Sequence, residues 1–294
     1  MLNTHQPTKG FVPVYKGHLY YEVAGSGRSI LFIHAGVASC SMWDDQFSLF
    51  SQSHQVIRYD TRGFGKSHTE TTEFSNRQDI LDLFNYLGIE KSVVIGISRG
   101  GQIAIDFTIE HPEYVSALIA IAAGVSGLDF QPGDDEKARH EFELFNHADE
   151  LWEKKAFDEL ADLEVHIWAD GPSQPVGRAS PQIREYIHKI VLANYNRPDG
   201  KPTPIPLNPP AADRLGEIHV PTLILVGEFD TSSTLATADK LEQEIPGSRK
   251  VIFPETAHML PMEQSQKFNE VVLNFLKDEG NYEHVPPAHS GAVA

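Results

Sequence analysis

The sequence predicts an α/β fold: a mostly parallel eight-stranded sheet with helices on both faces and a helical insertion. Two observations predict the sheet. Strand-like apolar runs alternate with helical patterns along the chain, which is the order of a parallel sheet wrapped by helices. Most of these runs are apolar without interruption, as in strands covered on both faces.

A third observation predicts the insertion. From Val125 to Asp213 the chain has helical patterns and connectors rich in Pro and Gly, but no strong strand pattern. We therefore expect a core formed by residues 10–124 and 214–280, a helical cap at 125–213, and a C-terminal tail at 281–294.

Each expected strand or helix is predicted from the residue pattern of its own segment. Strands are expected where short apolar or alternating runs are bounded by turn residues, and helices where apolar residues recur every three or four positions. In the helix at 74–89, for example, Ile80, Leu83, Phe84 and Leu87 share one stripe. In chain order we expect strands at 18–25, 29–36 and 54–60, a helix at 74–89, a strand at 92–98, a helix at 99–112, a strand at 115–124, cap helices at 134–163 and 180–196, a strand at 221–230, a helix at 235–246, a strand at 249–255 and a helix at 262–279.

The composition narrows the possible partners. Lys and Arg number 24 against 41 Asp and Glu, a formal net charge of −17, which disfavours nucleic acid and anionic membrane surfaces. Cys40 is the single cysteine, so no intramolecular disulfide forms, and we expect it to be buried. The chain shows no signal-peptide pattern and no apolar run of about 20 residues. We predict a cytoplasmic protein, monomeric or homodimeric, without a nucleic-acid or membrane partner.

The stretch "GISRG" combines a serine with two flanking glycines between an expected strand and an expected helix. Ser98 lies at the turn, with Gly96 and Gly100 two residues away on either side. A sharp strand-to-helix turn brings backbones close together, so bulk at these two positions would not fit, and it exposes the serine at a helix N-terminus. The alternative is a serine N-cap in a glycine-rich turn.

A serine nucleophile needs a general base and a carboxylate that orients the base. Asp230 follows the strand at 221–230, and His258 follows the strand at 249–255. Both therefore lie at carboxyl ends of strands, where open α/β sheets bind ligands. Glu228 is the rival acid, and Asp239 is a weaker one because it lies within a helix.

Acyl transfer also needs hydrogen-bond donors for the developing oxyanion. We expect the backbone N–H of Arg99 to be one donor and that of Gly36, in the loop "IHAGVASCSMW" after the third strand, to be the other. Val37 is the alternative to Gly36. Val37 and the cap residue Trp168 are the candidates for substrate contact.

Two other patterns resemble a phosphate loop and a metal site but lack residues or spacing that such sites need. "RGFGKS" has Asp60 where a phosphate loop needs Gly, so we interpret Asp60, Arg62 and Gly63 as a structural turn, in which Asp60 and Arg62 could interact. His140 and His147 lack the spacing of a metal site. No cofactor or metal is expected.

Five motifs together resemble the α/β-hydrolase superfamily over about Tyr20 to Leu276. They are "FIHAG", with Ala35 where Gly is usual, "YDTRGFGKS", "GISRG", "GEFD" and "TAHMLPMEQ". The resemblance implies a triad of Ser98, Asp230 and His258, and a cap inserted after the sixth strand.

These observations predict a serine hydrolase acting on a small or medium ester, thioester or lactone. Haloalkane dehalogenases and epoxide hydrolases of this fold use an Asp nucleophile, so Ser98 argues against both. Three alternatives stay open: a carbon–carbon bond hydrolase or a cofactor-free haloperoxidase with the same triad, and a non-catalytic ligand receptor.

Overall fold

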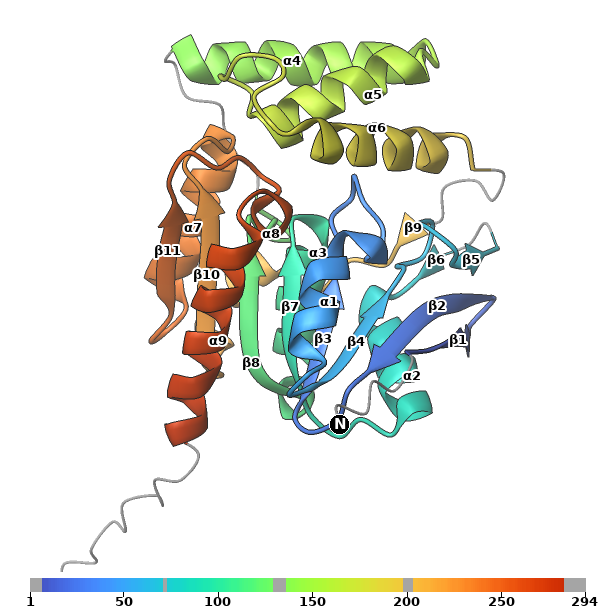
Figure 1. The fold of residues 1–294 in the computed structure, drawn as a ribbon, viewed down its shortest axis with the longest axis vertical. Helices are drawn as coiled ribbons and strands as arrows, with labels where there is room; N and C mark the ends of the chain where they lie inside the picture. Colours follow the sequence, from blue (N-terminus) through green and yellow to red (C-terminus); the bar gives the residue numbers. More distant parts are fainter. Residues whose placement is uncertain (1–6, 71–72, 129–135, 198–202, 283–294) are drawn as a thin grey trace, which may run out of the picture.

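A computed structural model describes residues 7–70, 73–128, 136–197 and 203–282. Its main sheet follows the order β1-β2-β4-β3-β7-β8-β10-β11, with β5 paired to β2 (Figure 1). This path has eight strands, the predicted number, although β1 is not among the seven that the sequence placed, and β5 adds a ninth. The pairs are antiparallel among β1, β2, β4 and β5 and parallel from β4 through β11. The α/β fold with a mostly parallel sheet is therefore confirmed.

The strands of this sheet are β1 (Thr8–Val14), β2 (Gly17–Ala24), β3 (Ser29–Ile33), β4 (Gln55–Tyr59), β5 (His68–Thr69), β7 (Ser92–Ile97), β8 (Val115–Ile121), β10 (Thr222–Gly227) and β11 (Arg249–Phe253). The central strands β3 and β7 are buried along their whole length, as their unbroken apolar sequences predict. A separate two-stranded sheet pairs β6 (Glu73–Phe74) with β9 (Thr203–Pro204).

Helices cover both faces of the sheet, and each face has its own apolar core. The core helices are α1 (Asp44–Phe50), α2 (Asn76–Leu87), α3 (Arg99–Glu110), α7 (Ser232–Glu244), α8 (Leu260–Glu263) and α9 (Ser265–Tyr282). Phe50 of α1 and Phe268 of α9 belong to one buried cluster, whereas Phe84 of α2 and Phe107 of α3 belong to the other. Cys40 is buried, as expected.

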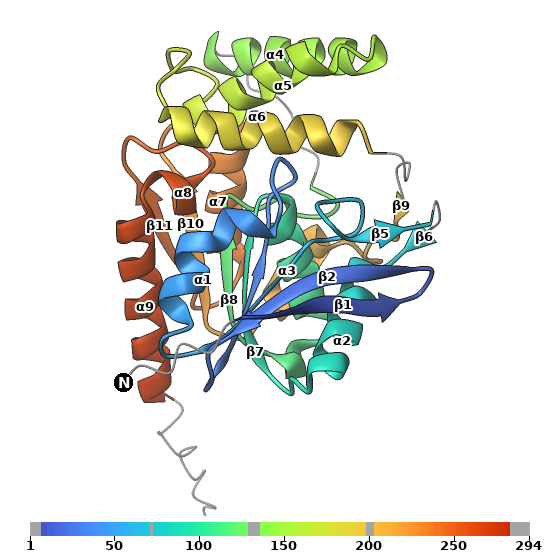
Figure 2. The ribbon, with the colours of Figure 1, turned by 45° about the vertical axis from the view of Figure 1, so that its right-hand side comes forward.

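The described part of the segment predicted as a cap contains three α-helices and one π-helical turn, followed by β9 and a short 3-10 helix at Ala211–Asp213. The α-helices and the turn are α4 (Glu136–Glu153), α5 (Phe157–Val165), the π turn His166–Asp170, and α6 (Pro181–Tyr195). Figures 1 and 2 show α4, α5 and α6 stacked above the sheet, on the side where α8 lies. The single helix expected at 134–163 is two helices, because the chain turns at Lys155, where φ is +57°.

The contact suggested between Asp60 and Arg62 does not form. Arg62 instead pairs with Asp79 of α2, its Nη2 lying 2.7 Å from Oδ1 and its Nε 2.8 Å from Oδ2. Asp60 accepts hydrogen bonds from the backbone N–H groups of Cys40 and Lys66, both at 2.7 Å. The loop is a structural turn, as predicted, but its arginine is held by a residue from another element.

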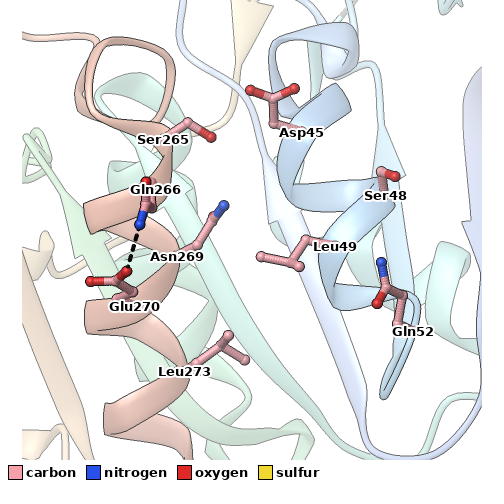
Figure 3. A pocket seen from close by; sticks show the side chains of 9 residues that line it. All are labelled: Asp45, Ser48, Leu49, Gln52, Ser265, Gln266, Asn269, Glu270 and Leu273. Carbon is pink, nitrogen blue, oxygen red and sulfur yellow. Dashed lines mark hydrogen bonds between the residues drawn. The ribbon is translucent and has the colours of Figure 1, made fainter.

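A surface groove lies between α1 and α9 (Figure 3). Asp45, Ser48 and Leu49 of α1 line one side, and Asn269 and Leu273 of α9 line the other. None of the predicted catalytic or substrate-contacting residues lines this groove. Among the described residues, no helix has the length and apolar character needed to cross a bilayer.

Candidate active site

Ser98 occupies a strained turn between β7 and α3. Its backbone has φ +57° and ψ −120°, a combination that a residue with a side chain rarely adopts and that costs about 1–3 kcal/mol. Its N–H donates to the carbonyl of Ile121 at the end of β8, at 2.8 Å. Neighbouring strands therefore hold the turn in place, and Ser98 stays only partly buried.

Glycines allow this turn by letting backbones approach closely. A Cβ on Gly96 would lie 2.1 Å from the carbonyl oxygen of Gly100. A Cβ on Gly100 would lie 2.5 Å from the carbonyl oxygen of Ile33 and 2.6 Å from that of His34. These distances support the prediction that neither position tolerates bulk.

We expect Gly100→Ala to lower the free energy of unfolding by about 1–3 kcal/mol, because the new methyl group forces backbone apart. Urea unfolding followed by circular dichroism measures the effect. Gly216→Ala is the matched control, since its Cβ would lie 3.9 Å from the nearest atom, the carbonyl oxygen of Glu244. An equal loss in both variants would contradict the close approach of α3 to β3.

The predicted acid and base are hydrogen bonded to each other. The Nδ1–H of His258 donates to the Asp230 carboxylate, with distances of 2.8 and 3.0 Å to its two oxygens. Asp230 is 1% exposed and His258 3% exposed. Because a carboxylate only accepts hydrogen bonds, this contact keeps the proton on Nδ1 and leaves Nε2 as the basic nitrogen.

The two loops that carry these residues are packed on each other. The N–H of Phe229 donates to the carbonyl of Thr256 at 2.9 Å. A Cβ on Gly227 would lie 2.3 Å from the carbonyl oxygens of Thr256 and Ala257. The rival acid Glu228 is exposed and accepts from the N–H of Glu255 at 2.9 Å, and Asp239 bonds to Lys250, so neither contacts His258.

The Nε2 atom of His258 is buried and has no hydrogen-bond partner in the part of the chain that the structure describes. A buried polar atom without a partner is costly and often marks a place where a reaction partner binds. The Ser98 hydroxyl does not bond to it here, and such bonds are often long in proteins without substrate. Trp168 lies against the same imidazole, with ring centroids 4.5 Å apart.

Gly36 and Arg99, whose N–H groups are the predicted oxyanion donors, lie close together. A Cβ on Gly36 would lie 3.8 Å from the Cβ of Arg99. No described residue accepts a hydrogen bond from the N–H of Gly36 or of Arg99. Val37 is partly buried and packs against the apolar core.

A buried network beneath these donors was not predicted from the sequence. His34 accepts from the N–H of Thr61 at 3.0 Å through Nε2 and donates through Nδ1 to the carbonyl of Ala35 at 2.7 Å. Burial lowers the pKa of His34 to about 4, so this ring is neutral at pH 7. Arg99 donates from Nη1 to the Thr61 hydroxyl at 2.7 Å and stacks on Phe64, and burial lowers its pKa to about 10.

A second contact that the sequence did not predict ties the cap to the loop of His258. Arg178 donates to both carboxylate oxygens of Glu263, at 2.7 and 2.8 Å, and to the carbonyl of Glu255 at 3.0 Å. Glu263 also accepts from the N–H of Ala257, next to His258, at 3.3 Å. A lone arginine in a Pro- and Gly-rich connector gives no local signal of this role.

Among the described residues, no group of three or more His, Cys, Asp or Glu side chains is arranged to hold a metal ion. His140 bonds to the carbonyl of Pro172 at 3.1 Å.

These features define a class of proteins: α/β sheets with a strained serine turn after one strand and a buried Asp–His pair in the loops after two others. Residues 30–271 match the model of the alpha/beta hydrolase family, and the chain belongs to that family. The structure of an esterase from Exiguobacterium antarcticum superimposes with a TM-score of 0.73 at 22% identity, covering 92% of this chain and 100% of that one, which shows a common fold.

Two curated relatives are hydrolases of different kinds. One is the 2-hydroxy-6-oxo-6-phenylhexa-2,4-dienoate hydrolase of Comamonas testosteroni, 24% identical over 88% of this chain and 91% of its own length. The other is 3-oxoadipate enol-lactonase 1 of Acinetobacter baylyi, 26% identical over 85% of this chain and 88% of its own length. These relatives support hydrolase chemistry and leave the bond that is cleaved undetermined.

Proposed function

We propose that the protein is a serine hydrolase that cleaves a small or medium carboxylic ester, thioester or lactone through an acyl-enzyme on Ser98. The observation that carries this proposal is the buried His258–Asp230 pair, whose imidazole has one basic nitrogen left open. The strained backbone of Ser98, which follows β7 in the same sheet as β10 and β11, supports the proposal.

The proposed reaction proceeds in two halves. His258 Nε2 takes the Ser98 proton while Oγ attacks the substrate carbonyl, and Asp230 stabilises the imidazolium that forms. The N–H groups of Gly36 and Arg99 bind the oxyanion. The imidazolium then protonates the leaving group, and a water molecule activated by His258 releases the acid from Ser98. These residues need no metal or cofactor for either half.

A second candidate is hydrolysis of a carbon–carbon bond by the same side chains. The dienoate hydrolase among the relatives favours this candidate, and the enol-lactonase favours a lactone or ester. We place the ester or lactone first because the proposed chemistry then needs only the three side chains and two N–H donors described above.

A substrate panel tests the proposal. It contains p-nitrophenyl esters graded by acyl length, thioesters, lactones and a dienoate ketone, each assayed with the wild-type protein and with Ser98→Ala. We expect the largest kcat/KM on an ester, thioester or lactone. Turnover of the dienoate alone would support the second candidate instead.

A fluorophosphonate probe separates enzymes from receptors on this fold. We expect the probe to label Ser98 in the folded protein and not in Ser98→Ala. A folded wild-type protein that takes up no label would favour a non-catalytic ligand receptor and contradict the proposed function.

A further inference from the structure

Glu164, in the cap helix α5, is a carboxylate without an ion pair among the described residues. One of its oxygens accepts from the Tyr195 hydroxyl of α6 at 2.9 Å, and the other accepts from the indole N–H of Trp168. Aromatic rings surround this group: Trp152 meets Tyr195 edge to face and Phe157 packs on it at a tilt, with centroids 5.2 and 5.7 Å away. A carboxylate in such surroundings is costly and calls for an explanation.

The contacts of Glu164 lead directly to the predicted base. Trp168 lies in the π turn after α5, and its ring lies 4.5 Å from the imidazole of His258. Single π-helical turns inside helices are frequent at functional sites. Trp168 comes four residues after Glu164 along the chain. The Glu164 carboxylate therefore holds the indole that lies against the imidazole of His258.

We propose that Glu164 is a positioning residue for His258: it holds Trp168 against the imidazole, and its negative charge favours the protonated ring that forms during catalysis. This inference rests on the proposed function. Asp230 meets the ring at Nδ1, and Glu164 is linked to it through Trp168, which lies against the same ring.

The surroundings of Glu164 act on its charge in opposite directions. Burial raises the pKa of Glu164 above its usual value, and the hydrogen bonds from Tyr195 and Trp168 and the charge of His258 oppose that rise. In the described part of the chain, the titratable groups that act on Glu164 are Tyr195 of α6 and His258 of the core. Helix α4 packs the rings of Phe145 and Trp152 against Trp168 and Tyr195. A charge on His258 that favours ionised Glu164 is, by reciprocity, itself favoured by ionised Glu164.

The test compares pH profiles of the full chain and three variants on one neutral ester. Glu164→Gln removes the charge and keeps the shape. Glu159→Gln is the matched control, because Glu159 is exposed on the same helix. Trp168→Phe keeps a ring beside His258 and removes the N–H that Glu164 accepts.

We expect Glu164→Gln to move the acidic limb of kcat/KM to lower pH, because the opposite charge no longer favours the imidazolium. Its kcat should fall by up to about tenfold. Trp168→Phe should also lower kcat but leave the acidic limb in place, since the carboxylate remains. Glu159→Gln should match the wild-type protein in both respects.

Two results would overturn the inference: a Glu164→Gln profile that superimposes on that of Glu159→Gln, or full kcat in Trp168→Phe. An NMR titration of the His258 ring in the wild-type and Glu164→Gln proteins needs no substrate, and its midpoint should fall in the variant. If Ser98-dependent hydrolysis is absent, the proposed function fails, while this titration still decides whether Glu164 acts on His258. Thermal unfolding of each variant establishes that it is folded.

Discussion

Ser98→Ala should lose about 10⁴-fold or more in kcat and still fold, because removing a nucleophile leaves only binding and oxyanion stabilisation. The backbone of Ser98 is held by the N–H bond to Ile121 and by the close approach of Gly96 and Gly100. Alanine can adopt the same strained φ, so the turn should persist. Steady-state kinetics with the best ester of the panel measures the loss.

Ser98→Gly provides a comparison on the same backbone. Glycine has no Cβ and adopts positive φ without strain, so this variant should be as inactive as Ser98→Ala and more stable than it by about 1 kcal/mol or more. Urea unfolding gives the difference. Turnover that survives both substitutions would exclude Ser98 as the nucleophile.

Asp230→Asn should lower kcat by roughly 10³–10⁴-fold at neutral pH, because an amide can donate to Nδ1 and thereby place the imidazole proton on Nε2. Nε2 of His258 would then already carry a proton and could not accept the one from Ser98. The hydrogen bonds from Nδ1 to both oxygens of Asp230 are the basis of this expectation.

Glu228→Gln is the matched control for the acid. Glu228 lies two residues away and is exposed, and its side chain accepts from the backbone N–H of Glu255, a hydrogen bond that an amide oxygen can also accept. Its kcat should stay within about twofold of the wild-type value, since a surface substitution rarely changes the free energy by more than about 0.5 kcal/mol. A larger loss in Glu228→Gln than in Asp230→Asn would reverse the assignment of the acid.

The features that the sequence predicted are those set by residues close together along the chain. Gly96, Ser98 and Gly100 lie within five residues, so the strained turn has a local signature. Asp230 and His258 each follow an apolar strand, and the parallel sheet brings those strand ends to one edge. The order of α and β patterns therefore sufficed for the fold class and for the meeting of acid and base.

Contacts between distant segments could not be predicted in this way. Arg62 pairs with Asp79 of α2 rather than with Asp60, because helix packing decides which carboxylate is near. Strand β1 contains Pro13 and exposed residues and lacks a strong apolar pattern, so it was not identified. The break at Lys155 also escaped notice, since a residue other than glycine gives little warning of positive φ.

The arginine that joins the cap to the loop of the base has a mechanical consequence. Arg178 donates hydrogen bonds to both carboxylate oxygens of Glu263 and to the carbonyl of Glu255, three residues before His258. We expect these contacts to couple any movement of α4, α5 and α6 to the position of the His258 imidazole. If His258 acts as the proposed base, loosening them should change the rate of proton transfer as well as the rate of product release.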